Sequence, residues 1–116
     1  MLKSMNIEQI AKTCYEANRI YCEQIGDYSQ PLWDDAPERM KVSARKGVKY
    51  IMENPTLSAA DLHESWLKHK QDEGWQYGET KNPAKKLHPC MIPYKELTRE
   101  QRFKDNLFLT IVKSFL

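Results

Sequence analysis

The sequence predicts an all-α fold: a compact four-helix domain with a small β-hairpin between the third and the last helix. Apolar residues recur at intervals of three and four along four segments, which is the pattern of amphipathic helices. Capping residues, glycines and prolines mark the ends of these segments. The stretch between the third and fourth segments has three prolines and no helical period, which favours short strands and turns.

Length and composition indicate one globular domain over residues 1–116. The chain has 116 residues, 41% of them hydrophobic and 29% charged, with a net charge of +2. This near balance gives no electrostatic reason to expect specific binding of nucleic acid. No apolar run approaches the roughly 18 residues of a membrane span. The first ten residues lack the apolar region of a secretory signal, so we expect a cytoplasmic protein with reduced cysteines.

The first helix is expected over residues 7–25. Asn6 is its predicted N-cap, with Gln9 as the capping-box partner. Gly26 is expected to end the helix. One face of this helix is apolar: Ile7, Ile10, Cys14, Ala17, Tyr21 and Ile25.

The second helix is expected from Pro37, which suits a first helical turn, to about Glu53. Asn54 and Pro55 stop it. Its buried stripe consists of Met40, Ala44, Val48 and Ile51.

The third helix is expected to start at Ser58, with Asp61 completing a capping box, and to end at Gly74. Its inward-facing residues are Leu62, Trp66 and His63. Beyond it, residues 75–77 and 91–92 are predicted to pair as a hairpin. The loop of this hairpin carries Lys81, Lys85, Lys86 and His88.

The last helix is expected from Thr98, its N-cap, to near Leu116, with Gln101 as the capping-box partner. It has two apolar faces: Phe103, Leu107, Ile111 and Phe115 on one, and Leu109, Val112 and Leu116 on the other. Such a helix is either buried centrally or part of a subunit contact.

Several rare residues occur at fixed spacings in the second half of the chain: His63-x-x-Trp66, Gly74-Trp75-x-Tyr77-Gly78, Lys85, His88-Pro89 and Pro93-Tyr94. This pattern resembles the RyR repeat family, which is named from ryanodine-receptor channels and also occurs as single copies in bacterial and phage proteins. The resemblance implies a compact helical domain with a small hairpin. It also implies a non-catalytic module. Nucleotide binding and a sensor role have been associated with this family.

Two interpretations of the aromatic residues stay open, a packed core and a ligand pocket. A flat purine would stack on tryptophan or tyrosine, and loop lysines would meet its phosphates. Asn18 would contact a base edge or anchor the following connector. The candidate ligand-binding residues are Asn18, Trp33, His63, Trp66, Trp75, Tyr77, Lys85 and His88.

Other chemistries find little support in the sequence. The segment His88-Pro89-Cys90 lacks the paired spacing of a zinc site. There is no nucleophile-elbow pattern and no glycine-rich phosphate loop. We therefore expect no metal, no cofactor and no catalytic activity. The expected partners are a nucleotide-type small molecule or, alternatively, a second copy of the chain or an effector protein.

Overall fold

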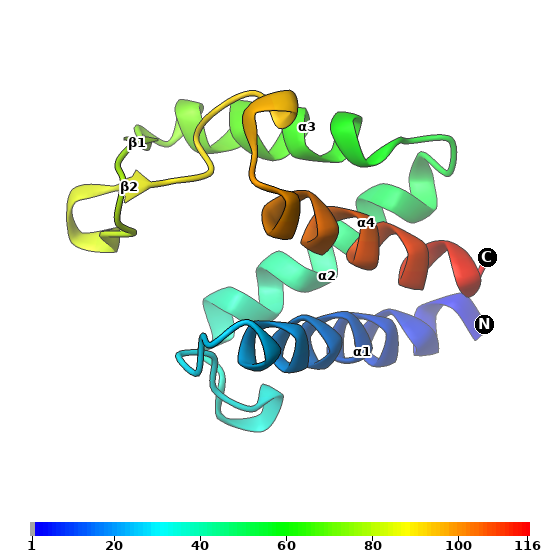
Figure 1. Ribbon diagram of the computed structural model, residues 1–116. Helices are drawn as coiled ribbons and strands as arrows, with labels where there is room; N and C mark the ends of the chain where they lie inside the picture. Colours follow the sequence, from blue (N-terminus) through cyan, green and yellow to red (C-terminus); the bar gives the residue numbers. More distant parts are fainter. Residues whose placement is uncertain (1) are drawn as a thin grey trace. The chain divides into compact units, whose positions relative to one another are not determined.

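The computed structural model describes the backbone of residues 2–116 and the side chains of residues 7–116. Over residues 2–116 it contains four α-helices and a two-stranded sheet (Figure 1), which confirms the predicted four helices with a small sheet between the third and the fourth. The elements are α1 (Leu2–Gln24), η1 (Trp33–Asp35), α2 (Glu38–Glu53), α3 (Ala59–Asp72), β1 (Gln76–Tyr77), η2 (Pro83–Lys85), β2 (Leu87–His88), η3 (Tyr94–Glu96) and α4 (Arg99–Ser114), where η denotes a short 3-10 helix.

The chain divides into two compact units. Unit 1 consists of Met1–Thr56 and Leu107–Leu116, and unit 2 consists of Leu57–Asn106. The N-terminal half of α4 therefore belongs to unit 2, and its C-terminal half belongs to unit 1.

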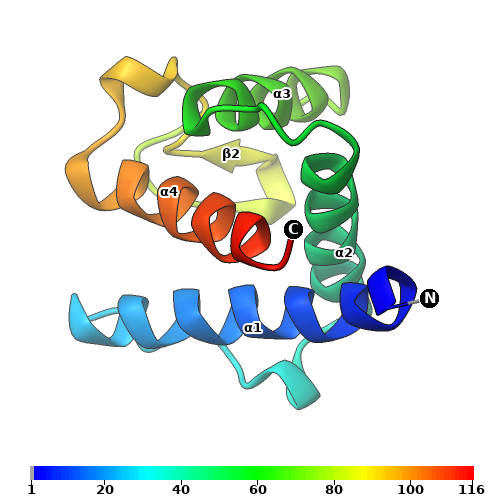
Figure 2. The ribbon, with the colours of Figure 1, turned by 90° about the vertical axis from the view of Figure 1, so that its right-hand side faces the viewer.

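The core of unit 1 joins α1, α2 and the C-terminal half of α4. Figure 2 shows α2 crossing α1 near the N-terminal part of α1. A Cβ added at Gly47 of α2 would lie 2.9 Å from Cζ of Phe108, so only glycine lets this ring pack so closely. The buried side chains of this core are Ile10, Ala11, Cys14, Cys22, Val48, Ile51, Leu109 and Val112.

The start of α1 differs from the prediction. The helix begins at Leu2, so Asn6 lies within it and is not its N-cap. The side chain of Asn6 lies outside the described residues. The preceding residues include leucine, lysine and methionine, which are good helix formers, and they extend the helix beyond the expected start.

Gly26 ends α1 as predicted, through a backbone motif. Its φ of +93° is a left-handed conformation that favours glycine. The N–H of Gly26 donates to the carbonyl oxygen of Glu23 at 3.1 Å, and the N–H of Asp27 donates to that of Cys22 at 2.8 Å. These paired bonds form a Schellman motif, which satisfies carbonyl groups at the helix end.

Two of the three predicted capping boxes are confirmed, those of α3 and α4, whereas the pair Asn6 and Gln9 lies within α1. At α3, the N–H of Asp61 donates to Oγ of Ser58, and the N–H of Ser58 donates to the Asp61 carboxylate, both at 3.1 Å. At α4, Thr98 and Gln101 make the same exchange at 3.1 and 2.9 Å. Pro37 is the N-cap of α2 and lies just before its first turn.

The sheet is small as expected, but its strands do not form a hairpin. β1 pairs with β2 in parallel, with Gln76 opposite Leu87 and Tyr77 opposite His88. The prediction that residues 91–92 supply the second strand is therefore wrong. The physical reason is a second chain reversal: Asn82 pairs with Leu87 in an antiparallel bridge, so the chain passes β1 in its original direction.

One of the two predicted apolar faces of α4 is largely buried. Leu109 and Val112 are 8% and 0% exposed, whereas Leu116 beyond the helix end is 52% exposed. On the other face, Phe103 and Phe115 are 46% and 48% exposed. The face of Leu109 and Val112 therefore helps to form the core of unit 1.

Candidate ligand-binding site

The candidate ligand-binding residues fall into two sets. Asn18 and Trp33 belong to unit 1. The other six belong to unit 2: His63, Trp66, Trp75, Tyr77, Lys85 and His88.

Five rings of unit 2 lie in series, and we call them the aromatic row: Tyr94, His63, Trp66, His88 and Trp75. The centroids of successive rings are separated by 6.1, 5.5, 5.2 and 6.2 Å. His63 is buried and 3% exposed, whereas the other four side chains are partly exposed. The two contacts of His88 are edge-to-face, an arrangement that aromatic rings favour.

Helix α3 supplies the first part of this arrangement. His63, Trp66 and Lys70 recur at intervals of three and four, so their side chains lie on one face of the helix. The capping box at the start of α3 fixes where this face begins.

The C-terminal end of α3 brings Trp75 back against Lys70. Gly74 has a φ of +92°, and its N–H donates to the carbonyl oxygen of Gln71 at 3.0 Å. The backbone N–H of Trp75 donates to the carbonyl oxygen of Lys70, also at 3.0 Å. This is again a Schellman motif, in which the first and last residues usually make an apolar contact. Here the Nζ of Lys70 lies 4.9 Å from the centroid of the Trp75 ring, a cation–π contact.

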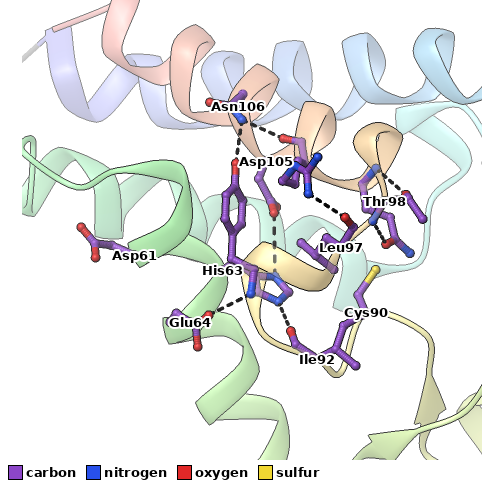
Figure 3. Close-up of polar contacts among 12 residues, drawn as sticks. Asp61, His63, Glu64, Cys90, Ile92, Leu97, Thr98, Asp105 and Asn106 are labelled. Atoms are coloured by element: carbon purple, nitrogen blue, oxygen red, sulfur yellow. Dashed lines mark hydrogen bonds and ion pairs between the residues drawn. The ribbon is translucent and has the colours of Figure 1, made fainter.

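His63 anchors the segment that follows β2 (Figure 3). Its Nε2 donates to the carbonyl oxygen of Ile92 at 2.7 Å, and its Nδ1 lies 3.8 Å from Oδ2 of Asp105. The neighbouring carboxylate of Glu64 accepts a hydrogen bond from the N–H of Tyr94 at 3.0 Å. Burial raises the pKa of Asp105 to about 6, although His63 acts in the opposite direction. Both nitrogens of the His63 ring therefore face partners within the protein.

His88 lies between the two tryptophans as a neutral imidazole. Its Nδ1 accepts a hydrogen bond from the N–H of Cys90 at 2.9 Å, so its proton is on Nε2. Burial lowers the pKa of His88 to about 4, and the charges of Lys81, Lys70 and Lys104 act in the same direction. At neutral pH the imidazole of His88 is thus uncharged, and the charges of three lysines act on it.

The predicted residues Tyr77 and Lys85 lie at the surface. Tyr77 is 53% exposed and is paired in register with His88. Lys85 is exposed, whereas the Nζ of Lys86 donates to the carbonyl oxygen of Glu73 at 2.7 Å. Of these lysines, Lys86 therefore has a structural role at the end of α3.

The two candidates of unit 1 have different surroundings. Trp33 is 4% exposed, and its ring contacts that of Tyr15, with centroids 5.5 Å apart, and the Nζ of Lys41, 5.5 Å from the Trp33 centroid. The backbone N–H of Trp33 donates to the carboxylate of Glu16 at 2.8 Å. In Asn18, Oδ1 is buried and has no hydrogen-bond partner among the described residues.

A family model described as the RyR domain matches residues 36–116 of the chain. The chain belongs to the RyR domain family. The matched RyR domain spans α2 to α4 and includes the whole aromatic row, whereas α1 and η1 precede it. The resemblance noted in the sequence is therefore confirmed, and the inclusion of residues 1–35 in the same domain stays a prediction. Within residues 2–116, no helix has the length and apolar character needed to cross a membrane.

Two lysines of this RyR domain were missed by sequence reasoning, Lys70 and Lys104. A signal for Lys70 existed, because it lies four residues before the glycine that ends α3 and five before an aromatic residue. Lys104 carries no comparable local signal. Its influence on His88 depends on the tertiary fold of unit 2.

The side chains of the RyR domain offer stacking surfaces and positive charge in preference to a reactive nucleophile. Burial raises the pKa of the Cys90 thiol, and the charge of Asp105 acts in the same direction. In unit 1, burial raises the pKa of Cys14 to about 12. Both thiols are therefore protonated at neutral pH and weakly nucleophilic. In the described part of the chain, no group of three or more His, Cys, Asp or Glu side chains is arranged to hold a metal ion.

Proposed function

We propose that this chain is a non-catalytic, ligand-sensing module that binds a nucleotide or a nucleotide-derived small molecule. The observation that carries the proposal is the partly exposed series Trp66–His88–Trp75, with the ammonium group of Lys70 over the Trp75 ring. Membership of the RyR domain family supports the same conclusion.

The proposed binding mode uses each chemical feature of this series. A flat base stacks on the ring of Trp66 or Trp75, and each such contact contributes about 1–3 kcal/mol. The ammonium groups near His88 attract the phosphates. The Nε2–H of His88 donates to a ligand acceptor, because the neutral imidazole already uses Nδ1 as its own acceptor.

The remaining candidates differ in what they can contribute. Tyr77 and Lys85 are exposed, and we keep them as proposed ligand contacts at the edge of the site. Asn18 belongs to unit 1 and stays a separate prediction, because its buried Oδ1 is an acceptor without a partner among the described residues. Trp33 and His63 are left out, because protein groups already occupy the ring faces and polar atoms through which they would bind.

Titration calorimetry with ADP, ADP-ribose and a cyclic dinucleotide tests this proposal. We expect heat of binding with at least one of them and a raised melting temperature, since a ligand at 100 times its Kd stabilises the folded state by about 2.7 kcal/mol. Trp75→Leu should weaken binding at least about fivefold by removing a stacking surface. Tyr50→Leu is the matched control, because Tyr50 is an exposed aromatic residue of α2. No heat and no melting shift at millimolar ligand would disprove the proposal.

A second candidate function is protein interaction, through homodimerisation or contact with an effector. The observation that favours it is the exposed apolar pair Phe115 and Leu116, which directly follows α4 and is 48% and 52% exposed. Light scattering at increasing protein concentration tests the homodimer, and a mass that remains monomeric counts against it.

A further inference from the structure

We propose that Lys70 sets the charge selectivity of this site: its ammonium group covers the Trp75 ring when no ligand is bound and pairs with the anionic part of a ligand whose base takes that ring. This inference rests on the proposed function, because it concerns the same aromatic row. It assigns Lys70 as a specificity-determining residue and predicts that the site favours anionic aromatic ligands over neutral ones.

The end of α3 holds the two side chains together. The hydrogen bond from the N–H of Trp75 to the carbonyl oxygen of Lys70 joins their backbones at 3.0 Å. The Nζ of Lys70 then lies 4.9 Å from the Trp75 centroid and 3.9 Å from Oε1 of Glu73. The side chain of Lys70 is 28% exposed, so its ammonium group remains accessible to solvent. Lys70 is thus placed by the helix end and is not locked in place.

A base that stacks on this face of Trp75 must displace the ammonium group. A cation–π contact at an exposed site is worth about a twofold to fivefold factor in an equilibrium constant. Stacking of a base is worth about fivefold to 150-fold, so displacement is favourable in most of this range. A neutral ligand loses the cation–π contact without compensation. An anionic ligand regains it as an ion pair.

The surroundings of Lys70 favour that second role. Its charge already acts on His88, in the same direction as those of Lys81 and Lys104. The lysine side chain is flexible, which lets Nζ move from the ring to a phosphate while the backbone of α3 stays in place. The ion pair with Glu73 is partly exposed and long, so it opposes this movement only weakly.

The test compares adenosine, AMP and ADP as probes, in wild type and in two variants of the full chain. Lys70→Met removes the charge, and Lys70→Gln removes it without adding an apolar side chain. We expect both variants to bind ADP at least about fivefold more weakly, and Lys70→Gln to bind adenosine about twofold to fivefold more tightly, because only this variant leaves the Trp75 ring uncovered. The selectivity of Lys70→Gln for ADP over adenosine then falls at least tenfold. Lys68→Met is the matched control, because Lys68 is exposed on the same helix, and it should leave the selectivity unchanged.

Each outcome decides the inference. If wild type binds the probes and the Lys70 variants change adenosine and ADP affinity in the same direction, or no more than Lys68→Met does, Lys70 does not set charge selectivity while the proposed function stands. If wild type binds none of the three probes, the proposed function fails for adenine ligands and this inference fails with it.

Discussion

Each unit contains a tryptophan with a lysine ammonium group over its ring, but the two pairs differ in what else surrounds the ring. Trp33 of unit 1 is 4% exposed, and the ring of Tyr15 packs against it. Trp75 of unit 2 is partly exposed and has the edge-to-face contact with His88 beside Lys70. The same cation–π pair therefore serves packing in one unit and is accessible to solvent in the other.

The difference originates in how each tryptophan is held by its backbone. The N–H of Trp33 donates to the carboxylate of Glu16, a side chain of α1, which binds η1 to another element. The N–H of Trp75 donates to a carbonyl oxygen of the helix that it has just left. A tertiary bond draws Trp33 into the core of unit 1, whereas a local bond leaves Trp75 at the surface of unit 2.

Truncation of the two tryptophans is the strongest test of this comparison. Trp33→Ala should lower the free energy of unfolding by about 3–5 kcal/mol, because it leaves a cavity in a buried site. Trp75→Ala should lower it by about 1–2 kcal/mol, because part of the ring is already in water. Urea denaturation of both variants measures the difference. Equal losses would show that Trp75 is as much a packing residue as Trp33.

The pH dependence of stability gives the next largest effect. The pKa of Asp105 rises from 3.8 to about 6 in the folded state, so the folded state binds more protons and stability falls as pH rises from about 4 to 6. The pKa of His88 falls from 6.5 to about 4, so the unfolded state binds more protons and stability rises between about pH 4 and 6.5. In wild type these two contributions oppose each other.

Single variants separate the two contributions. Relative to wild type, Asp105→Asn should make stability rise more steeply with pH in this window, and His88→Gln should make it fall more steeply, each by about 1–3 kcal/mol in total. Urea unfolding at pH 4, 5 and 6.5 measures both slopes. Parallel pH profiles in wild type and both variants would contradict the pKa shifts of Asp105 and His88. Titrating groups would then not distinguish the surroundings of Trp75 from those of Trp33.

An effect of similar size is expected at Gly78, which follows β1. A Cβ added there would lie 2.7 Å from the Cβ of Leu87, so Gly78→Ala must push β2 away. We expect a loss of about 1–3 kcal/mol and weaker ligand binding, because His88 is the neighbour of Leu87 on β2. Gly26→Ala is the control for backbone strain alone, since nothing lies within 4 Å of its added Cβ. If Gly78→Ala keeps full ligand affinity, β2 does not position the aromatic row.

Features set by local interactions were predictable from the sequence, and features set by tertiary geometry were not. The capping pairs Ser58–Asp61 and Thr98–Gln101 act within one helical turn and were predicted from their residue types. The same reasoning was wrong for Asn6 and Gln9, because α1 extends back to Leu2. The parallel pairing of β1 and β2 was not predictable, because two-residue strands have no measurable period and the turn at Asn82 decides their direction.

The same distinction applies to the candidate site. Trp66, Trp75 and His88 were identified by residue type, because large amphipathic side chains are rare enough to be conspicuous. Their arrangement in one row, with Lys70 over the Trp75 ring, depends on a helix end and on contacts between distant segments. Residue types therefore indicated the kind of site, and the fold determined which charges accompany it.

The smallest expected effect concerns the two lysines themselves. Lys41→Met should lower the free energy of unfolding by about 0.5–1 kcal/mol, because its cation–π partner is buried and its charge also favours the Glu8 carboxylate. Lys70→Met should change stability by less than about 0.5 kcal/mol, because a methionine side chain can still cover the exposed face of Trp75. Thermal and urea unfolding of the two variants measure this pair. A larger loss for Lys70→Met would mean that its ammonium group belongs to the packing of unit 2, and the two tryptophan–lysine pairs would then be alike.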